Sequence, residues 1–217
     1  MDVQAVLDTV VVELNKQKKK RSGLINPSSL GQCYRRQLWN RNDVTPTNPP
    51  DARALKLFRV GNMFHKDLQS ILPADMCEVE FTKEDVHGFA DFVGVDCVVD
   101  FKTVGNYQWR LFKKKGFRIE EEKIDYILQL MTYCYFFDKP VGVLLFICKD
   151  TYEMLKFPYY LEDWRDRVDE ELDILRGFWF NKRTPPAQPR LYKGKECVYC
   201  NFFDLCRETE VKTIGES

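Results

Sequence analysis

The sequence lacks the features that would place it in a membrane or mark it as a strongly basic nucleic-acid binder. Its longest apolar run, Val141–Cys148, is far shorter than the roughly 20 residues of a membrane-spanning helix and suits a buried strand. The N-terminus has no basic segment ahead of its apolar stretch, so we expect no signal peptide and a cytoplasmic protein. The 33 basic and 33 acidic residues cancel, and net charge gives no argument for nucleic acid.

The 217 residues are enough for one domain with a substantial core, and the charge that is present is unevenly placed. Basic residues gather in runs at 16–21, 35–36 and 113–118. Any one of these runs, taken alone, is typical of a solvated surface. Together they keep a nucleic-acid partner open despite the neutral total.

Apolar periodicity divides the chain into alternating helical and extended stretches. The spacing predicts helices at 2–15, 29–39, 52–71, 122–137 and 161–179. Short β-branched and aromatic runs predict strands at 78–82, 87–93, 97–103, 141–148 and 151–158. The order of these elements after the first helices is three strands, a helix, two strands and a helix, which indicates an α/β fold with a mixed sheet. An irregular, proline-containing C-terminal segment follows.

The segment 87–103 carries the strongest chemical signal. If it is a hairpin with an even-length loop near Gly94–Cys97, Asp91 lies directly opposite Asp100, and Lys102 shares the face of Asp100. An odd-length loop would instead put the two carboxylates on opposite faces. The other face of the hairpin is apolar and should pack on a helix, through Ala90, Phe92, Val99 and Phe101.

Two carboxylates facing each other on a half-buried strand pair destabilise it unless a cation lies between them. Oxygen ligands suit Mg²⁺ or Mn²⁺, and such an ion can activate water and stabilise charge on a phosphate. Lys102 would then hold the water or the phosphate. The segment alone leaves an alternative open, in which both aspartates face solvent and Lys102 is their salt-bridge partner.

Three further short motifs accompany this segment, and each taken alone would suggest only a structural role. In chain order the four motifs are Gly61-x-x-x-His65, Gly88-x-x-Asp91, Asp100-x-Lys102 and Gln129-x-x-x-Tyr133. This order resembles the RecB-like branch of the PD-(D/E)XK nuclease superfamily. The resemblance implies a restriction-endonuclease-like core, in which helices flank a mixed central sheet.

Carried over residue by residue, the resemblance also implies roles. His65, Asp91, Asp100 and the carbonyl of Phe101 would bind a Mg or Mn ion. Lys102 would be catalytic with the two aspartates, and two more residues of the catalytic set, Gln129 and Tyr133, would orient DNA or the lysine. One departure is that Asp100 stands where glutamate is common in the wider superfamily.

The eight cysteines fall into two groups. Four lie inside apolar stretches and are predicted to be ordinary buried thiols: Cys77, Cys97, Cys134 and Cys148. Cys197, Cys200 and Cys206 form a cluster of three soft ligands with no histidine after them, so a fourth ligand must come from elsewhere.

The segment around Cys33 resembles the N-terminal cysteine motif of iron–sulfur RecB-like exonucleases. These include a CRISPR-associated exonuclease and the nuclease domain of AddB, with phage relatives. The resemblance implies that Cys33 joins the three late cysteines around a [4Fe–4S] cluster. A four-thiolate zinc site is the alternative, because spacing does not separate the two. Residues 1–184, which supply Cys33, would form the nuclease domain, and 185–217 an iron–sulfur segment packed on it.

Several residues near these motifs are candidates for DNA contact. Arg35 and Arg36 follow Cys33 directly, and Lys113 and Lys114 could track phosphates. Aromatic rings after the active-site strand could stack on single-stranded bases or could equally pack in the core, namely those of Tyr107 and Trp109.

The resemblance implies a DNA exonuclease of a prokaryotic cell or its phage, acting on single-stranded DNA or DNA ends, with endonuclease cleavage left open. A second hypothesis is an end-processing subunit of a recombination, repair or CRISPR-adaptation complex that is active mainly with partners. A third is a non-enzymatic DNA-binding module. The presence of Asp91, Asp100 and Lys102 together argues against the third.

Overall fold

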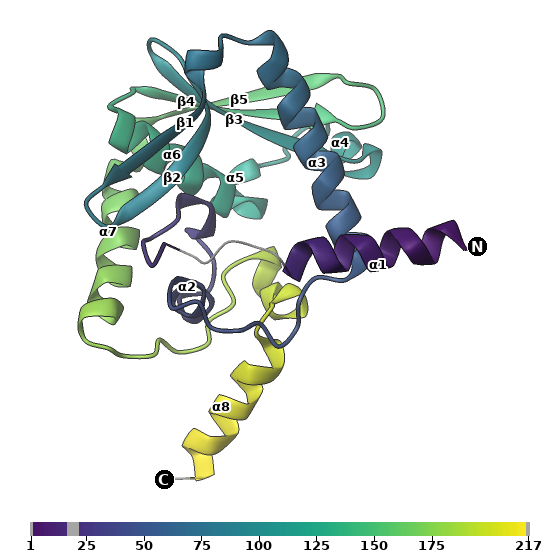
Figure 1. Ribbon diagram of the computed structural model, residues 1–217. Helices are drawn as coiled ribbons and strands as arrows, with labels where there is room; N and C mark the ends of the chain where they lie inside the picture. The colour runs from purple at the N-terminus through teal and green to yellow at the C-terminus, as the bar shows by residue number, and fades with distance from the viewer. Residues whose placement is uncertain (1, 17–21, 216–217) are drawn as a thin grey trace.

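The computed structural model describes residues 2–16 and 22–215 and is built on one mixed five-stranded sheet (Figure 1). The strands lie side by side in chain order, β1 (Cys77–Lys83), β2 (Val86–Val93), β3 (Cys97–Val104), β4 (Val141–Cys148) and β5 (Met154–Tyr160). Every neighbouring pair is antiparallel except β3 and β4, which are parallel. The predicted α/β class with a mixed sheet is therefore confirmed.

The described part of the chain also contains α-helices of very different length. They are α1 (Val3–Lys16), α2 (Tyr34–Arg41), α3 (Ala52–Ile71), α4 (Asn106–Phe112), α5 (Ile119–Glu122), α6 (Ile124–Phe137), α7 (Leu161–Phe180) and α8 (Phe203–Gly215). None of these helices is both long and apolar enough to cross a membrane.

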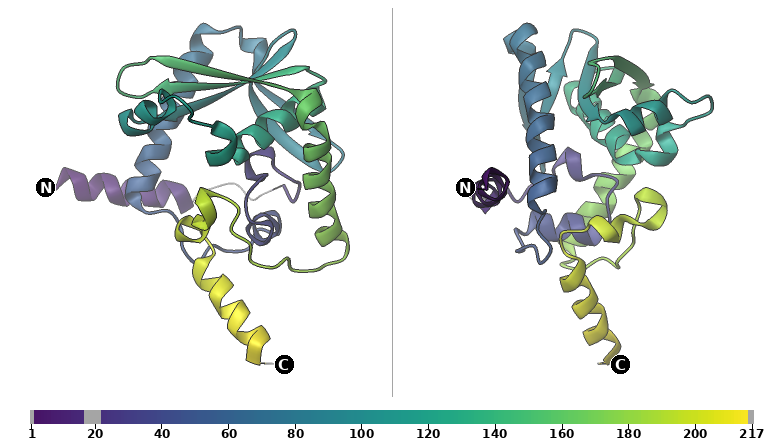
Figure 2. Two further views of the ribbon diagram at one scale, coloured as in Figure 1. Left: turned by 180° about the vertical axis from the view of Figure 1, so that it is seen from behind. Right: turned by 90° about the vertical axis from the view of Figure 1, so that its right-hand side faces the viewer.

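Helices cover both faces of the sheet, with α3 on one side and α6 on the other (Figure 2). The α3 side is a small cluster in which Leu68 of α3 meets Phe101 and Ile147 of the sheet. On the other side, α6 is the crossover that a parallel β3–β4 pair requires. This sandwich fixes the carboxyl-terminal half of β3 between two helices.

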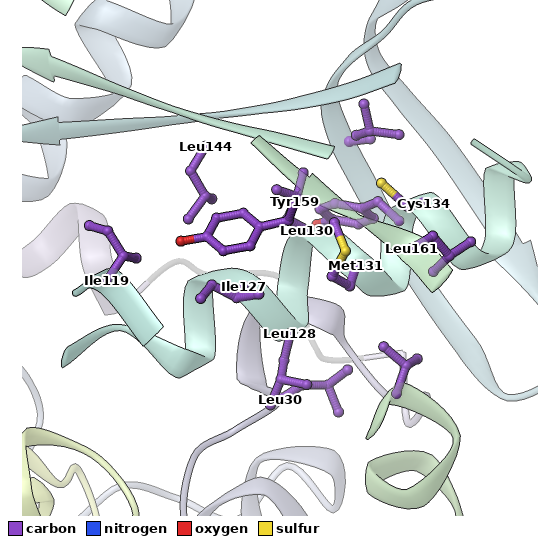
Figure 3. Close-up of a cluster of buried hydrophobic side chains, with 14 of the residues drawn as sticks. Leu30, Ile119, Ile127, Leu128, Leu130, Met131, Cys134, Leu144, Tyr159 and Leu161 are labelled. Carbon is purple, nitrogen blue, oxygen red and sulfur yellow. The ribbon is translucent and has the colours of Figure 1, made fainter. Parts of the chain in front are cut away.

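The main core surrounds α6, and most of that helix is apolar and buried (Figure 3). Ile127, Leu128 and Met131 are fully buried there, and Leu30 packs beneath the helix from the segment before α2. Gly142 lets β4 approach closely, because a Cβ at this position would collide with Met131. Since α6 is held on all sides, it is a rigid support for the polar side chains that face β3.

Three α-helices of the described residues were not predicted. Each is either stabilised by contacts from distant parts of the sequence or too short to show a clear apolar periodicity. The N-terminus of α4, for example, is capped by Asp150, whose side chain accepts the Asn106 N–H at 2.9 Å. The expected helix at 29–39 begins only at Tyr34, because residues before it form a 3₁₀ turn and Gly31 adopts φ +77°. The other unpredicted helices are α5 and α8.

Candidate active site

The β2–β3 hairpin has the register that the sequence predicted. Phe92 pairs with Val99 and Val93 with Val98, which sets Asp91 opposite Asp100. Ladder pairing stops at that point, because the Asp91 carboxylate takes the place of a strand partner. Its Oδ2 accepts the backbone N–H of Phe101 at 2.7 Å. The two strands therefore separate where the predicted site begins.

The alternation of β2 also breaks at Asp91. Ala90 belongs to the main core on the α6 side, whereas Phe92 packs with the cluster on the α3 side. Opposite Asp91, Glu78 of β1 has φ +48°, a left-handed conformation that interrupts the regular pleat. The prediction that Ala90 shares the helix-packed face of Phe92, Val99 and Phe101 is thus wrong for Ala90, and the break turns Asp91 toward α3.

Asp100 is deeply buried beside Lys102. Its side chain is 1% exposed, and Lys102 Nζ lies 2.8 Å from its Oδ2. Burial raises the pKa of Asp100, and the charge of Lys102 lowers it in part. Within the described residues, Asp100 Oδ1 has no hydrogen-bond partner, and Oδ2 has only the Lys102 ammonium. The alternative of two solvent-facing aspartates does not fit this burial.

The ammonium of Lys102 is held by α6 as well. Its Nζ donates to Gln129 Oε1 at 3.0 Å, and Gln129 Nε2 lies 3.3 Å from the Tyr133 hydroxyl. The same ammonium lies 4.8 Å from the ring centre of Tyr126. Tyr126, Gln129 and Tyr133 therefore share one face of α6. The sequence reading found the last two and missed Tyr126, although its position three residues before Gln129 was a usable signal.

On the α3 side, His65 Nδ1 lies 3.3 Å from Asp91 Oδ1. Burial disfavours the charged imidazole, but the hydrogen bond and charge of Asp91 raise the pKa of His65. Donor atoms of His65, Glu78 and Asp91 all lie within 4.8 Å of one another. Glu78 was not predicted, and the β1–β2 register that brings it opposite Asp91 could not be read before the pairing was known.

These residues fit a hard divalent cation. Asp100 has a buried carboxylate whose Oδ1 no described residue binds and whose Oδ2 contacts only Lys102. It lies opposite Asp91, whose oxygens group with donor atoms of Glu78 and His65. A buried carboxylate without hydrogen bonds is costly unless a cation or proton compensates it. Oxygen-rich sets of this kind suit Mg²⁺ or Mn²⁺. Phe101 follows Asp100 in β3, and its backbone N–H donates to Asp91, so the Phe101 backbone lies directly beside this carboxylate.

The aromatic residues predicted to stack on DNA differ in access. Tyr107 is 78% exposed at the start of α4, so its ring faces remain open. Trp109 is 3% exposed and donates its indole N–H to Glu153 at 3.0 Å. Because the Trp109 ring is buried, a DNA base cannot stack on it. The expected DNA contact is therefore wrong for Trp109, and the alternative of core packing holds.

The basic candidates are divided in the same way. Lys114 is exposed, whereas Lys113 is paired with Glu153 at 3.2 Å. Arg35 is buried, with its Nε donating to the Pro185 carbonyl, so it does not present a guanidinium to solvent as expected. Arg36 is half-buried and lies 3.5 Å from Glu196. Most of the basic run at 16–21 lies outside the described residues.

The four predicted cluster cysteines come together although the chain separates them widely. They line a single cavity of about 120 Å³, with Cys33 contributed from the N-cap of α2 and the others from the C-terminal segment, Cys197, Cys200 and Cys206. Burial raises the pKa of Cys197, and the neighbouring cysteines raise it further. Of the four thiols predicted to be buried, Cys134 and Cys148 are buried and Cys77 and Cys97 are half-buried.

A buried carboxylate joins the two ends of the chain at this cavity. Glu196 is almost fully buried, and its two oxygens accept the Cys33 N–H at 2.9 and 3.1 Å. Glu196 also accepts the backbone N–H of Arg190 at 2.9 Å. On the opposite side of the cavity, the Arg35 guanidinium donates to Cys206 Sγ at 3.2 Å. The division of the chain at 184/185 stays a prediction.

The comparisons with known proteins bear on the fold. No protein-family model matches the sequence, and none of the curated proteins searched does. Among solved structures, the chain is similar to SSO0001, with TM-score 0.60, 20% identity, and 95% of this chain and 96% of that chain covered. It is also similar to an alkaline exonuclease, LHK-Exo, from Laribacter hongkongensis, with TM-score 0.51, 11% identity, and coverage of 75% and 90%.

A second structure of LHK-Exo, in complex with dAMP, matches with TM-score 0.50 and 12% identity, covering 74% of this chain and 89% of that one. The chain shares its fold with an exonuclease. At these identities the likeness concerns the fold alone, so the chemistry must be argued from the residues described above.

Proposed function

We propose that the chain is a metal-dependent DNA exonuclease that hydrolyses phosphodiester bonds in single-stranded DNA or at DNA ends. The observation that carries this proposal is Asp100, a carboxylate that is 1% exposed, lies opposite Asp91 and has only the Lys102 ammonium beside its oxygens among the described residues. The shared fold with an alkaline exonuclease, one of whose structures contains dAMP, supports the same reaction class.

The ion would be Mg²⁺ or Mn²⁺, held by His65, Asp91, Asp100 and the Phe101 carbonyl, with Glu78 as an added candidate. When bound, such an ion supplies an activated water and charge stabilisation on the phosphate. Lys102 is kept beside the carboxylates by Gln129, so its ammonium is positioned to stabilise negative charge that develops on the reacting oxygen atoms.

For the cysteine cavity we propose a [4Fe–4S] cluster with a structural role, with zinc as the alternative. The support is the convergence of four thiols on one cavity together with the resemblance of their sequence context to iron–sulfur exonucleases. Closing a loop of more than 160 residues is entropically unfavourable without a clip. A bound cluster would provide that clip between α2 and the C-terminal segment.

One observation favours the second function, an end-processing subunit that needs protein partners. Net charge is zero, and of the six residues predicted to contact DNA, Arg35 and Trp109 are buried and Lys113 is ion-paired. Arg36 faces Glu196, so among these six Lys114 is the one exposed cation without an ion pair in the described part of the chain. Phosphate contacts supply much of the affinity of proteins for DNA. Addition of a partner protein would then be needed for tight binding.

The test is cleavage of end-labelled single-stranded DNA by purified protein with Mn²⁺ or Mg²⁺. We expect Asp100→Asn and Lys102→Met each to slow cleavage by about 10²-fold or more, because each removes a charge that acts on the transition state. Asp96→Asn, an exposed aspartate in the same hairpin, is the matched control and should cleave like the wild type. Equal rates for wild type and Asp100→Asn would refute the proposal.

A further inference from the structure

A row of alternating lysine and tyrosine side chains leads from the candidate active site into the cysteine segment. We call it the lysine–tyrosine row, and it consists of Lys102, Tyr126, Lys123, Tyr192 and Tyr199. The ammonium groups of Lys102 and Lys123 both lie on the Tyr126 ring, at 4.8 and 5.2 Å from its centre. Lys123 also lies 5.2 Å from the ring centre of Tyr192.

The row continues with exposed aromatic rings. Tyr192 and Tyr199 are in contact, with ring centres 5.5 Å apart and planes at 72°. Tyr192 is 38% exposed and Tyr199 is 67% exposed, so each ring has a face open to solvent. Tyr199 lies between Cys197 and Cys200 in the chain, which places the end of the row at the cysteine cavity.

Lys123 is the unexplained member of the row. Within the described residues its ammonium contacts the rings of Tyr126 and Tyr192, and no ion pair or side-chain hydrogen bond of this ammonium is found there. Glu122, one of its two acidic neighbours, is paired with Lys193 at 2.8 Å, and Asp125 is buried and acts on Lys123 only through its field. Burial lowers the pKa of Lys123, so its charged form lacks full compensation.

The two aromatic contacts of Lys123 offset part of this desolvation, because a cation over a ring gains roughly 0.5–2 kcal/mol. An anion from outside the chain would compensate the charge more fully. A nucleic-acid phosphate is such an anion, and Lys102, the other ammonium on the Tyr126 ring, marks the position of the candidate active site. Beyond Lys123, the exposed rings of Tyr192 and Tyr199 offer surfaces on which bases could stack.

We propose that the lysine–tyrosine row is a track for single-stranded DNA, in which Lys123 binds a phosphate next to the one at Lys102 and Tyr192 and Tyr199 stack on the bases that follow. This inference rests on the proposed function and names its substrate form. Single-stranded bases expose their faces to aromatic side chains, whereas the bases of a duplex are stacked on one another. The row thus favours single strands over duplex DNA.

The test measures binding without cleavage, using full-length protein with no added Mg²⁺ or Mn²⁺ and fluorescence anisotropy of a labelled oligothymidylate. Lys123→Ala should lower the slope of log affinity against log salt by about 0.7, the contribution of one phosphate contact on a single strand. Lys156→Ala, which removes one exposed charge from the outer strand β5, is the matched control and should leave the slope unchanged. Lys123→Arg keeps the charge and should keep the slope.

The aromatic part of the track is tested with Tyr192→Ala and Tyr199→Ala. Each should weaken binding of the oligothymidylate by about fivefold or more, since one base–aromatic stack contributes at least that much. Binding of a hairpin duplex should change much less. Tyr192→Phe and Tyr199→Phe keep the ring and should bind like the wild type.

Two results would overturn the track. One is an unchanged salt slope for a folded Lys123→Ala, with Lys123→Arg serving as the folded reference if the alanine variant melts early. The other is equal weakening of single-strand and duplex binding in the tyrosine variants. Failure of the proposed function looks different: the wild type would bind the oligothymidylate with the pattern above yet leave it uncut with Mg²⁺ and Mn²⁺.

Discussion

The candidate active site and the cysteine cavity are assembled in opposite ways. The active site takes Asp91, Asp100 and Lys102 from a single hairpin and adds the adjacent face of α6. The cysteine cavity takes Cys33 from the N-terminal part and its other thiols from the last described turns of the chain. A short hairpin needs no clip to bring its residues together, whereas the distant ends do. The first site should therefore be separable from global stability, and the second should not.

The largest expected effect on stability concerns the cysteine cavity. Cys200→Ser should remove a ligand of the clip and lower the free energy of unfolding by about 4–5 kcal/mol, the size expected for a cross-link that closes a loop of 100 residues or more. Denaturant unfolding of the variant measures this. If Cys200→Ser has the stability and the metal content of the wild type, the cysteine cavity is not the clip that holds the distant parts of the chain together.

A smaller effect is expected from Glu196, the buried carboxylate that joins Cys33 to the C-terminal segment. Glu196→Gln keeps the shape but loses the charge that accepts two backbone N–H groups and faces Arg36. A hydrogen bond to a charged group contributes about 1.5–3 kcal/mol, so we expect a loss of about 2 kcal/mol. Metal release to a chelator should also be faster than in the wild type. An unchanged rate of metal release would show that Glu196 does not stabilise the cysteine cavity.

On the active-site side, changes at Tyr126 are expected to affect the rate of cleavage. Tyr126→Phe keeps the ring beneath Lys102 and should cleave within about twofold of the wild type. Tyr126→Leu loses the cation–π contact and should slow cleavage by about fivefold, equivalent to about 1 kcal/mol. The ratio of kcat between the two variants is the readout. Equal kcat in both would show that the ring does not position Lys102.

The smallest effect is expected from Trp109. Trp109→Phe should leave affinity for single-stranded DNA unchanged, because the indole is buried, and should reduce stability by about 1 kcal/mol through loss of the hydrogen bond to Glu153. Anisotropy and thermal unfolding on the same variant separate the two. Weaker DNA binding at full stability would restore Trp109 as a DNA contact.

Much of the active-site region could be predicted from the sequence, because its information is local. The period of β2 and β3 predicts Asp91 opposite Asp100 on the condition of an even-length loop, and the observed register meets that condition. The sequence could not predict the break at Asp91, since it depends on Glu78 of another strand adopting φ +48°. Glu78 was missed for the same reason, because its relevance appears only when β1 is paired with β2. Tyr126 was missed although its spacing from Gln129 was a usable signal.

The cysteine region was predicted in outline and missed in detail. Resemblance brought Cys33 to Cys197, Cys200 and Cys206, and the structure places all four on one cavity. Spacing could not predict that Arg35 would turn inward to Cys206, nor that Glu196 would be buried against the backbone of Cys33. The sequence alone does not show whether a basic residue next to a ligand motif lies on the surface or in the interior, because tertiary packing decides this.

The most direct test of the central claim is Mn²⁺ binding by electron paramagnetic resonance on wild type, Asp100→Asn and Asp96→Asn, with cleavage of labelled single-stranded DNA measured on the same samples. We expect the wild type and Asp96→Asn to bind Mn²⁺ and cleave, and Asp100→Asn to lose both while remaining folded. An Asp100→Asn protein that binds Mn²⁺ and cleaves at the wild-type rate would contradict the assignment of the buried carboxylate and the function built on it.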